Sequence, residues 1–598
     1  MLRRTTPYLC VLLVAVVLAV VEHDFLFEAQ EQSLFLHTRL FFEQLTVRSG
    51  GLLTWAGCYL TQLFYYPWLG AGVLCGLWAL LMLLMKVTFR LPTAWMPLTL
   101  VPVACLLLTV VTLGYWVYFL KLPGALFVGT TGMLAAMALL WGYRQVWRWR
   151  MASAPYVLTA AVAGYVLFGF YGLWAVVLMA LTACRRDYRR PVDVLAAVAG
   201  IVGTPLLCYH FNVLHETNIV NIYWTALPVF SHTGASFPTY YVPYGVLLVV
   251  TAVLTLGRFN TQPHRWQQWL QGAVLALTVA GVAAFWYKDD NFHRELSMRH
   301  SIERQDWEQA LKTAEGVKGE PTRAVCMMRN LALFRLGRLG DEAFGYANGA
   351  SKPAAPFAVR LVHTVGKMLY LEYGVPNYCY RWCMEDGVEY GWTAERLKLM
   401  VKCSLLNGET AAAQQLLSLL KRTDFHKGWA QRYQACLHNP NLMAQDQQLA
   451  TIARQMRDDD FLTADQSQME RFLIEHFITA ESHEPLLQEL SLMATLQTKN
   501  IEQFWRQFYQ YTELHREQRV PRHYQEAACL FGHLQNFDIG HMPFDREVSA
   551  SCEDFLNQVS HYRSQGKSGE QISQLVYPRF HATYYYDFYF NSYNYVEP

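Results

Sequence analysis

Long apolar segments fill the first half of the chain, and the pattern changes near Lys288. A helix needs about 20 apolar residues to cross a bilayer. Segments of about that length occur at residues 7–23, 67–89, 95–120, 124–143, 192–209, 240–257 and 266–287. After Asp290 most of the charged residues appear, and helical amphipathic patterning replaces the apolar runs. The pattern predicts a transmembrane helical domain over residues 1–287, followed by a water-exposed domain.

One further apolar stretch, residues 155–184, is too long for an ordinary single span. It holds Gly164, Gly169 and Gly172, so it could be one tilted helix or a hairpin of two short helices. Arginines flank it on both sides, and the positive-inside rule places both groups in the cytoplasm. A hairpin satisfies that rule and a single span does not, so we predict a hairpin and about nine spans in total.

The distribution of Lys and Arg between the loops predicts the orientation. The loops assigned to the outside carry only Arg39, Arg48 and Lys121. The loops assigned to the cytoplasm carry Arg3, Arg4, Lys86, Arg90, Arg144, Arg148, Arg150, Arg185, Arg186, Arg189, Arg190, Arg258 and Arg265. The amino terminus is therefore predicted in the cytoplasm and the carboxy-terminal half outside it. A cleaved signal peptide is the alternative for the first segment, but no small-x-small cleavage site precedes Glu22.

The second half, residues 288–576, shows helical patterning with a weak repeat. Four segments, QDWEQALKTAE, LGRLGDEAFGY, YGVPNYCYRWC and NGETAAAQQLL, resemble the helix-turn-helix unit of tetratricopeptide repeats. Their small anchor residues are Ala310, Ala343, Cys379 and Ala413, which are 33, 36 and 34 positions apart. That repeat has a period of about 34 residues. We predict an all-α protein with an α-solenoid outside the cytoplasm; the alternative is an irregular helical bundle.

The last 22 residues, 577–598, form a tyrosine-rich tail. Within it, the alternating aromatic residues of YDFYFNSYNY, residues 586–595, suit an extended segment. The tail is expected to cap the last helices or, alternatively, to lie at the level of the lipid headgroups, where Tyr is favoured.

Composition excludes several classes of function. A net charge of +2 without a clustered basic surface argues against nucleic-acid binding. The centres of the predicted spans lack Asp, Glu, Lys and Arg, which disfavours ion-coupled transport. Seven of the 13 cysteines lie in the second half without a CxxC pair, so no disulfide framework is indicated.

Candidate functional residues lie in two loops on the predicted outer face. The first loop begins with Glu22 and Asp24 and continues with Glu28 and Glu31, which share one helical face. The second loop contains His210, His215 and Glu216, but Ile219 breaks an HExxH zinc motif. These groups could line a substrate cavity, or they could form a polar collar and a docking loop.

The layout resembles that of GT-C membrane glycosyltransferases, which use polyprenyl-phosphate-linked sugars. Those enzymes carry an acidic-x-acidic motif in the first outer loop, and Glu22-His23-Asp24 stands in that place. The resemblance implies that Glu22 or Asp24 would act as a general base or bind a divalent metal. It covers the layout and three residues only.

The phrases GLLTWAGCYLTQLFYYPWLGA and RNLALFRLGRLGDEAF carry a second resemblance. They are similar to a family of bacterial polytopic membrane proteins with a helical carboxy-terminal half, a resemblance that implies no activity. We therefore expect an inner-membrane protein that displays a tetratricopeptide-like platform in the periplasm for a protein partner. A GT-C-like transferase is the alternative.

Overall fold

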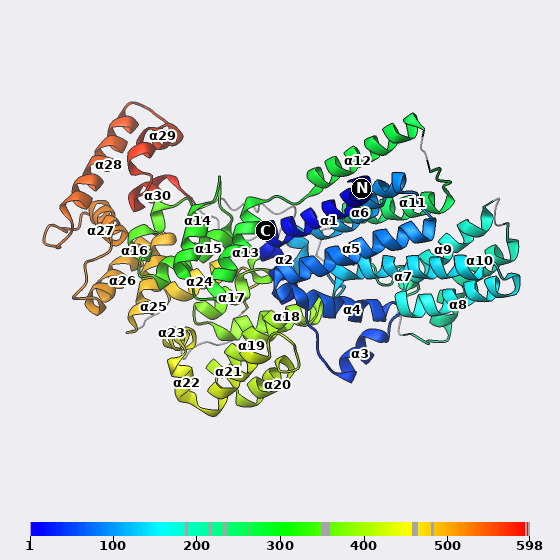
Figure 1. Cartoon of the computed structure of the whole chain (residues 1–598). Helices are drawn as coiled ribbons and strands as arrows, with labels where there is room; N and C mark the ends of the chain where they lie inside the picture. The colour runs from blue at the N-terminus through cyan, green and yellow to red at the C-terminus, as the bar shows by residue number, and fades with distance from the viewer. Residues whose placement is uncertain are drawn as a thin grey trace. The chain divides into compact units, whose positions relative to one another are not determined.

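The computed structural model describes residues 2–185, 189–214, 218–230, 236–261, 264–348, 359–456, 464–479, 483–592 and 595. Within these ranges the chain is built of helices and forms no β-strand (Figure 1). A single isolated antiparallel bridge joins Leu120 and Phe230. The predicted all-α class is confirmed for this part of the chain.

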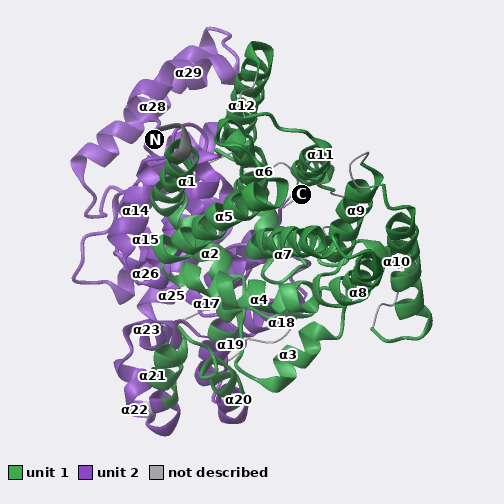
Figure 2. Cartoon of the chain, turned by 45° about the vertical axis from the view of Figure 1, so that its right-hand side comes forward, with its two compact units in different colours: residues 1–288, 386–398, 415–434 green, residues 289–385, 399–414, 435–598 purple. Residues whose placement is uncertain are grey.

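The chain divides into two compact units (Figure 2). Unit 1 comprises residues 1–288, 386–398 and 415–434, and unit 2 comprises residues 289–385, 399–414 and 435–598. The break in composition at Lys288 therefore coincides with the end of the first stretch of unit 1. Two later segments, 386–398 and 415–434, also belong to unit 1, so the chain passes between the units after residues 288, 385, 398, 414 and 434.

The first stretch of unit 1 holds twelve of the described helices. They are α1 (Leu2–Val21), α2 (His23–Glu31), α3 (Arg39–Thr46), α4 (Gly51–Gln62), α5 (Pro67–Phe89), α6 (Leu100–Val111), α7 (Ala125–Val146), α8 (Arg150–Phe168), α9 (Phe170–Cys184), α10 (Pro191–His210), α11 (Val242–Leu256) and α12 (Arg265–Phe285). Short 3₁₀ helices lead into α6 (Thr93–Thr99) and α11 (Pro238–Tyr241).

Seven helical segments of the described chain are long and apolar enough to cross a membrane. They are Pro67–Phe89, Thr93–Val111, Ala125–Val146, Arg150–Phe168, Pro191–His210, Pro238–Leu256 and Arg265–Phe285. Helix α1 joins them only together with α2, from which it is bent by 76°. Helix α9 has 15 residues, fewer than the ~20 that a straight span needs. Each predicted segment thus forms a helix, but seven or eight spans, rather than nine, meet the criterion.

The stretch 155–184 is divided at Gly169, as the flanking arginines predict. Gly169 ends α8 and precedes α9 with a φ of +56°, a conformation that favours glycine. The two helices then pack closely, because a Cβ at Gly172 would lie only 2.1 Å from the carbonyl oxygen of Gly164.

Arginines bring several helix ends together. Arg190 donates to the carbonyl oxygen of Trp147 at the end of α7 (2.8 Å), and Arg185 donates to that of Thr255 near the end of α11 (3.0 Å). Arg144 also donates to the carbonyl oxygen of Thr88 in α5. Cations are stabilised at helix carboxyl ends, where carbonyl groups lack intrahelical partners. The arginines that flank the hairpin therefore share one end of the bundle with the ends of α5, α7 and α11.

Unit 2 and the returning segments supply the other helices. They are α13 (Asp290–Glu303), α14 (Trp307–Glu315), α15 (Arg323–Arg335), α16 (Leu339–Glu342), α17 (Gly366–Glu372), α18 (Pro376–Tyr390), α19 (Ala394–Leu406), α20 (Thr410–Leu420), α21 (Lys427–His438), α22 (Pro440–Gln445), α23 (Gln447–Gln455), α24 (Met469–Ile478), α25 (Pro485–Gln497), α26 (Ile501–Leu514), α27 (Arg522–Gln535), α28 (Arg546–Ser564), α29 (Gly569–Phe580) and α30 (Tyr584–Phe590). Helices α18 to α21 each begin in one unit and end in the other.

The four predicted repeat segments share one local geometry. A residue with positive φ stands two positions before the second helix of each pair, namely Gln305, Gly337, Gly374 and Gly408. The anchors Ala310, Ala343, Cys379 and Ala413 are all buried. Lys499 repeats the turn before α26, in a region where the sequence shows no register. These hairpins fit the repeat units, and their stacking as a solenoid stays a prediction.

Residues 586–590 of the tyrosine-rich tail belong to helix α30, where an extended segment was expected. Thr583 caps α30 by accepting a hydrogen bond from the backbone N–H of Tyr586. The side chains of Tyr584 and Tyr585 are fully buried, and Tyr585 shares a hydrogen bond of 2.5 Å with Ser551 of α28. The extended prediction is wrong because three consecutive tyrosines, rather than alternate ones, find buried positions. Their packing accords with a capping role.

Candidate functional site

Helix α2 carries most of the candidate acidic residues and follows the sharp bend after α1. Glu28, Gln30 and Glu31 are all buried there, with 6%, 0% and 2% of their surfaces exposed. Buried carboxylates are costly unless they are paired or hydrogen-bonded. The residues that pair with these buried side chains therefore indicate whether this part of the molecule has a structural or a chemical role.

Glu31 pairs with a lysine far away in the sequence. The Lys398 Nζ lies 2.7 Å from Glu31 Oε2, and both side chains are at least nine-tenths buried. His426 Nε2 lies 3.8 Å from Glu31 Oε1 and 2.8 Å from Gln30 Nε2. Gln30 also donates to Gln62 Oε1 of α4, at 3.3 Å. The Glu31 carboxylate thus lies close to a lysine and a histidine, and two amides continue the contacts from the histidine.

A second chain of hydrogen bonds begins at Glu28. Its Oε1 accepts from Gln32 Nε2 at 2.9 Å, and the same amide nitrogen donates to Glu395 Oε2 at 2.6 Å. Arg396 Nη2 donates to Gln32 Oε1 at 3.4 Å, and its Nη1 donates to the carbonyl oxygen of Gly391. Gln32 therefore bridges two glutamates and an arginine. We name the two sets of contacts together the α2 junction: Glu28, Gln30, Glu31, Gln32, Glu395, Arg396, Lys398 and His426.

Backbone and ring contacts extend the α2 junction along the segment that follows α2. The Ala394 N–H donates to the carbonyl oxygen of Ser33 at 3.2 Å, and the His37 N–H donates to that of Arg422 at 3.1 Å. The Tyr65 ring stacks on Phe425, with centroids 5.0 Å apart. Both returning segments of unit 1, 386–398 and 415–434, are thus bonded to the segment around α2.

The two carboxylates of the acidic-x-acidic motif have different surroundings. Glu22 is 3% exposed, and its Oε1 accepts a hydrogen bond of 2.7 Å from the indole Nε1 of Trp286. Asp24 is more exposed, and its Oδ1 lies 3.3 Å from His23 Nδ1. Glu22 therefore links the bend after α1 to the chain just past α12.

The second predicted loop is described only in part. His210 ends α10, and its ring meets that of Phe211 edge-on at 5.0 Å. His215 and Glu216 lie outside the described residues. Of the predicted site residues, Glu28 and Glu31 each contact returning-segment residues of the α2 junction, Glu28 through Gln32 and Glu31 directly.

Sequence reasoning missed the partners that complete the network. Lys398 and His426 are more than 360 positions from Glu31 in the sequence, and no motif links them. The available signal was their residue type: Lys is almost never fully buried unless it is paired, and Lys398 stands in an apolar helical pattern, AERLKLMVKCSLL.

A comparison with known proteins places the chain in a family. The model of a family of unknown function, DUF6057, matches residues 1–591. The chain belongs to this family. No curated protein and no solved structure matches the chain. The DUF6057 match spans α2 and both returning segments, so the whole α2 junction lies inside the family region.

The geometry of this DUF6057 protein favours a structural use of the α2 junction. Glu31 is neutralised in place by Lys398, and Glu28 and Glu395 are joined through Gln32. A general base has to lie within reach of a substrate proton. Here the carboxylates instead face groups of the same unit, an arrangement that fixes the position of the returning segments.

Proposed function

We propose that the protein is a multi-pass inner-membrane protein that displays a helical-repeat platform outside the cytoplasm and there binds a protein partner in envelope assembly. The observation that carries this proposal is the α2 junction. Removing one partner of a buried ion pair costs several kcal/mol of stability. Such a pair therefore holds the two segments that carry it in one relative position, whereas a looser contact would allow several. A platform whose chain is anchored beside a transmembrane helix would hold a bound partner at a fixed position relative to the membrane.

Two further observations support the proposal. The hairpins with left-handed turns fit stacked repeat units, and such stacks offer extended concave surfaces for binding. The arginines that gather at one end of the bundle fit the positive-inside rule, with that end in the cytoplasm. With an odd number of crossings, as the nine spans predicted from the sequence give, unit 2 would lie outside the cytoplasm.

The platform is tested by in vivo crosslinking of the full chain, followed by purification in detergent. A recurrent extracytoplasmic partner is expected, and its yield should fall in Lys398→Ala at equal protein level, with Lys121→Ala as the matched control. Lys121 forms an exposed pair with Glu389 at 2.7 Å. Recovery of the same partner at the same yield from all three chains would reject the anchoring role.

We keep a GT-C-like transferase using a lipid-linked sugar as the second candidate, because α1 and α2 are bent by 76° at Glu22, inside the acidic motif. In that case Asp24 would act as the general base or hold a divalent metal. Asp24→Asn should then abolish an envelope glycan at unchanged protein level. Trp286→Phe removes the hydrogen bond to Glu22 and leaves both carboxylates, so it separates a structural role of Glu22 from a chemical one. An unchanged glycan in Asp24→Asn would reject the enzyme.

A further inference from the structure

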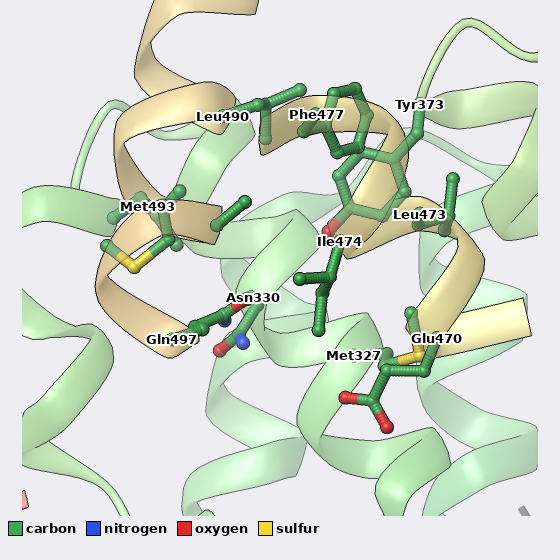
Figure 3. A pocket seen from close by; sticks show the side chains of 12 residues that line it. Met327, Asn330, Tyr373, Glu470, Leu473, Ile474, Phe477, Leu490, Met493 and Gln497 are labelled. Atoms are coloured by element: carbon green, nitrogen blue, oxygen red, sulfur yellow. The ribbon is translucent and has the colours of Figure 1, made fainter. Parts of the chain in front are cut away.

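A small cavity of about 50 Å³ lies within unit 2 among α15, α16, α24 and α25 (Figure 3). Leu473, Phe477 and Leu490 are among its apolar lining residues, and the amides of Asn330 and Gln497 lie at its polar edge. This volume exceeds the ~10–15 Å³ that one water needs. It is far below the ~300–1,000 Å³ of sites that enclose a whole small molecule. The cavity has room for one side chain and excludes a sugar or a lipid headgroup.

The charge at the cavity is already balanced. Glu470 is the charged residue of the lining, and Arg323 holds it with two hydrogen bonds, one of them 2.9 Å from Nε to Oε2. An unpaired charge brought into such a neutral, apolar site would lose its hydration without gaining a partner. The cavity therefore selects an uncharged aliphatic side chain.

Tyr595, close to the carboxyl terminus, lies at the same edge. The Tyr595 ring lies 5.7 Å from the Arg323 guanidinium carbon, and its hydroxyl donates to the carbonyl oxygen of Gln497 at 3.1 Å. Lys499 Nζ donates to the carbonyl oxygens of Asp587 and Phe588, which anchors the end of α30 nearby. Burial raises the pKa of the Tyr595 hydroxyl, in keeping with a docked ring. Tyr595 thus bridges Gln497 and the Arg323–Glu470 pair.

We propose that this cavity is a docking site for one uncharged aliphatic side chain of a partner protein, next to an aromatic ring that stacks on Arg323. In the free chain Tyr595 occupies the ring position, so the tail competes with the partner. The proposal rests on the proposed function, that unit 2 binds a protein. It adds the chemistry of the bound segment: an aromatic residue next to an aliphatic one, as in Tyr595-Val596 of this chain.

The test uses a fluorescent peptide with the sequence of residues 591–598, NSYNYVEP, and the full chain in detergent. Tyr595→Ala in the chain removes the competing ring, so it should bind the peptide at least ~10-fold more tightly than the unsubstituted chain, or ~1.4 kcal/mol. Adding Ala494→Phe fills the cavity and should reverse that gain. Ala550→Phe, at an exposed alanine, is the matched control. Equal affinity of the unsubstituted chain and Tyr595→Ala would overturn the proposal.

A second pair of variants covers the case in which Ala494→Phe unfolds the chain. Ile474 lines the cavity, so Ile474→Ala enlarges it. A peptide with Phe in place of Val596 should bind Ile474→Ala at least ~10-fold more tightly than a chain with Ile474, and equal binding would overturn the proposal. If a cellular partner is recovered and its yield is unaffected by Ala494→Phe, the platform proposal stands and the cavity proposal is rejected. If the peptide binds but no cellular partner is recovered, the cavity proposal stands and the platform proposal is rejected.

Discussion

At the residue scale, we expect a large loss of stability when the Glu31–Lys398 ion pair is broken. Both groups are buried, so the loss of one removes a direct charge partner from the other. Lys398→Ala should lower the free energy of unfolding by about 3–5 kcal/mol. Lys121→Ala, in the exposed pair with Glu389, should cost about 1 kcal/mol or less. Denaturant unfolding of the detergent-solubilised chains measures both, and equal losses would contradict the buried pair.

Glu489 predicts a dependence of stability on pH. Burial, and secondarily the charge of Asp341, raises its pKa from 4.5 to about 7. Below pH 4.5 the carboxyl is protonated in both states. As the pH rises from 4.5 to 7 the unfolded state ionises first, so the stability that the raised pKa contributes is lost, by at most about 3 kcal/mol.

Glu489→Gln isolates this effect. The variant should be more stable than the unsubstituted chain at pH 8, by up to about 3 kcal/mol, and nearly equal to it at pH 4.5. Glu502→Gln, at an exposed glutamate of α26, is the matched control at each pH. A difference between Glu489→Gln and the unsubstituted chain that stays constant from pH 4.5 to pH 8 would show that Glu489 ionises as readily in the folded state as in the unfolded one.

At the element scale, the α8–α9 hairpin depends on the close approach of Gly164 and Gly172. A methyl group at Gly172 would meet the Gly164 backbone at 2.1 Å, whereas one at Gly203 of α10 meets no atom within 4 Å. Gly172→Ala should therefore destabilise the protein by about 2 kcal/mol or more, and Gly203→Ala should be tolerated. The melting temperatures of the two variants in detergent are the readout, and equal values would argue against this packing.

The repeat turns predict opposite signs for two Gly→Ala substitutions. Gly408 has a φ of +72°, which an alanine adopts only with strain, so Gly408→Ala should destabilise by about 1 kcal/mol. Gly428 lies in the first turn of α21, without a positive φ and with open space at its Cβ, so Gly428→Ala should be neutral or stabilising. Thermal unfolding compares the two, and a shift of the same sign in both would reject the turn assignment.

The elements themselves were largely predictable, and their partners were not. The lengths of the apolar runs located the span helices, and the arginines on both sides of residues 155–184 predicted a hairpin there without choosing among Gly164, Gly169 and Gly172. These signals depend on residues near in sequence. The repeat turn at Lys499 escaped detection because a lysine carries no signal for positive φ. Residues 586–590 were predicted as extended because alternation does not reveal that α27, α28 and α29 offer buried sites to the consecutive tyrosines that begin α30.

At the scale of the whole molecule, the composition break at Lys288 separates the two halves of the sequence, but it does not separate the two units completely. Residues 386–398 and 415–434 are as polar as the rest of the second half, yet they belong to unit 1. The sequence predicted Glu28 and Glu31 as site residues because carboxylates without partners are energetically costly near a membrane surface. It gave no means of finding Lys398 and His426, because pairing over such a separation depends on the fold alone.

The central claim, that segments of the second half are held beside α2, is tested most directly by a disulfide between His37→Cys and Asp424→Cys. These side chains meet at 2.8 Å and are about half exposed. A protease site inserted at residues 231–235 would separate positions 37 and 424 after cleavage. We expect mild oxidation in membranes to keep the two fragments together in the His37–Asp424 cysteine pair, but not in an Arg148–Asp424 cysteine pair, whose positions also lie in different fragments. Fragments that separate equally in both pairs would contradict the claim.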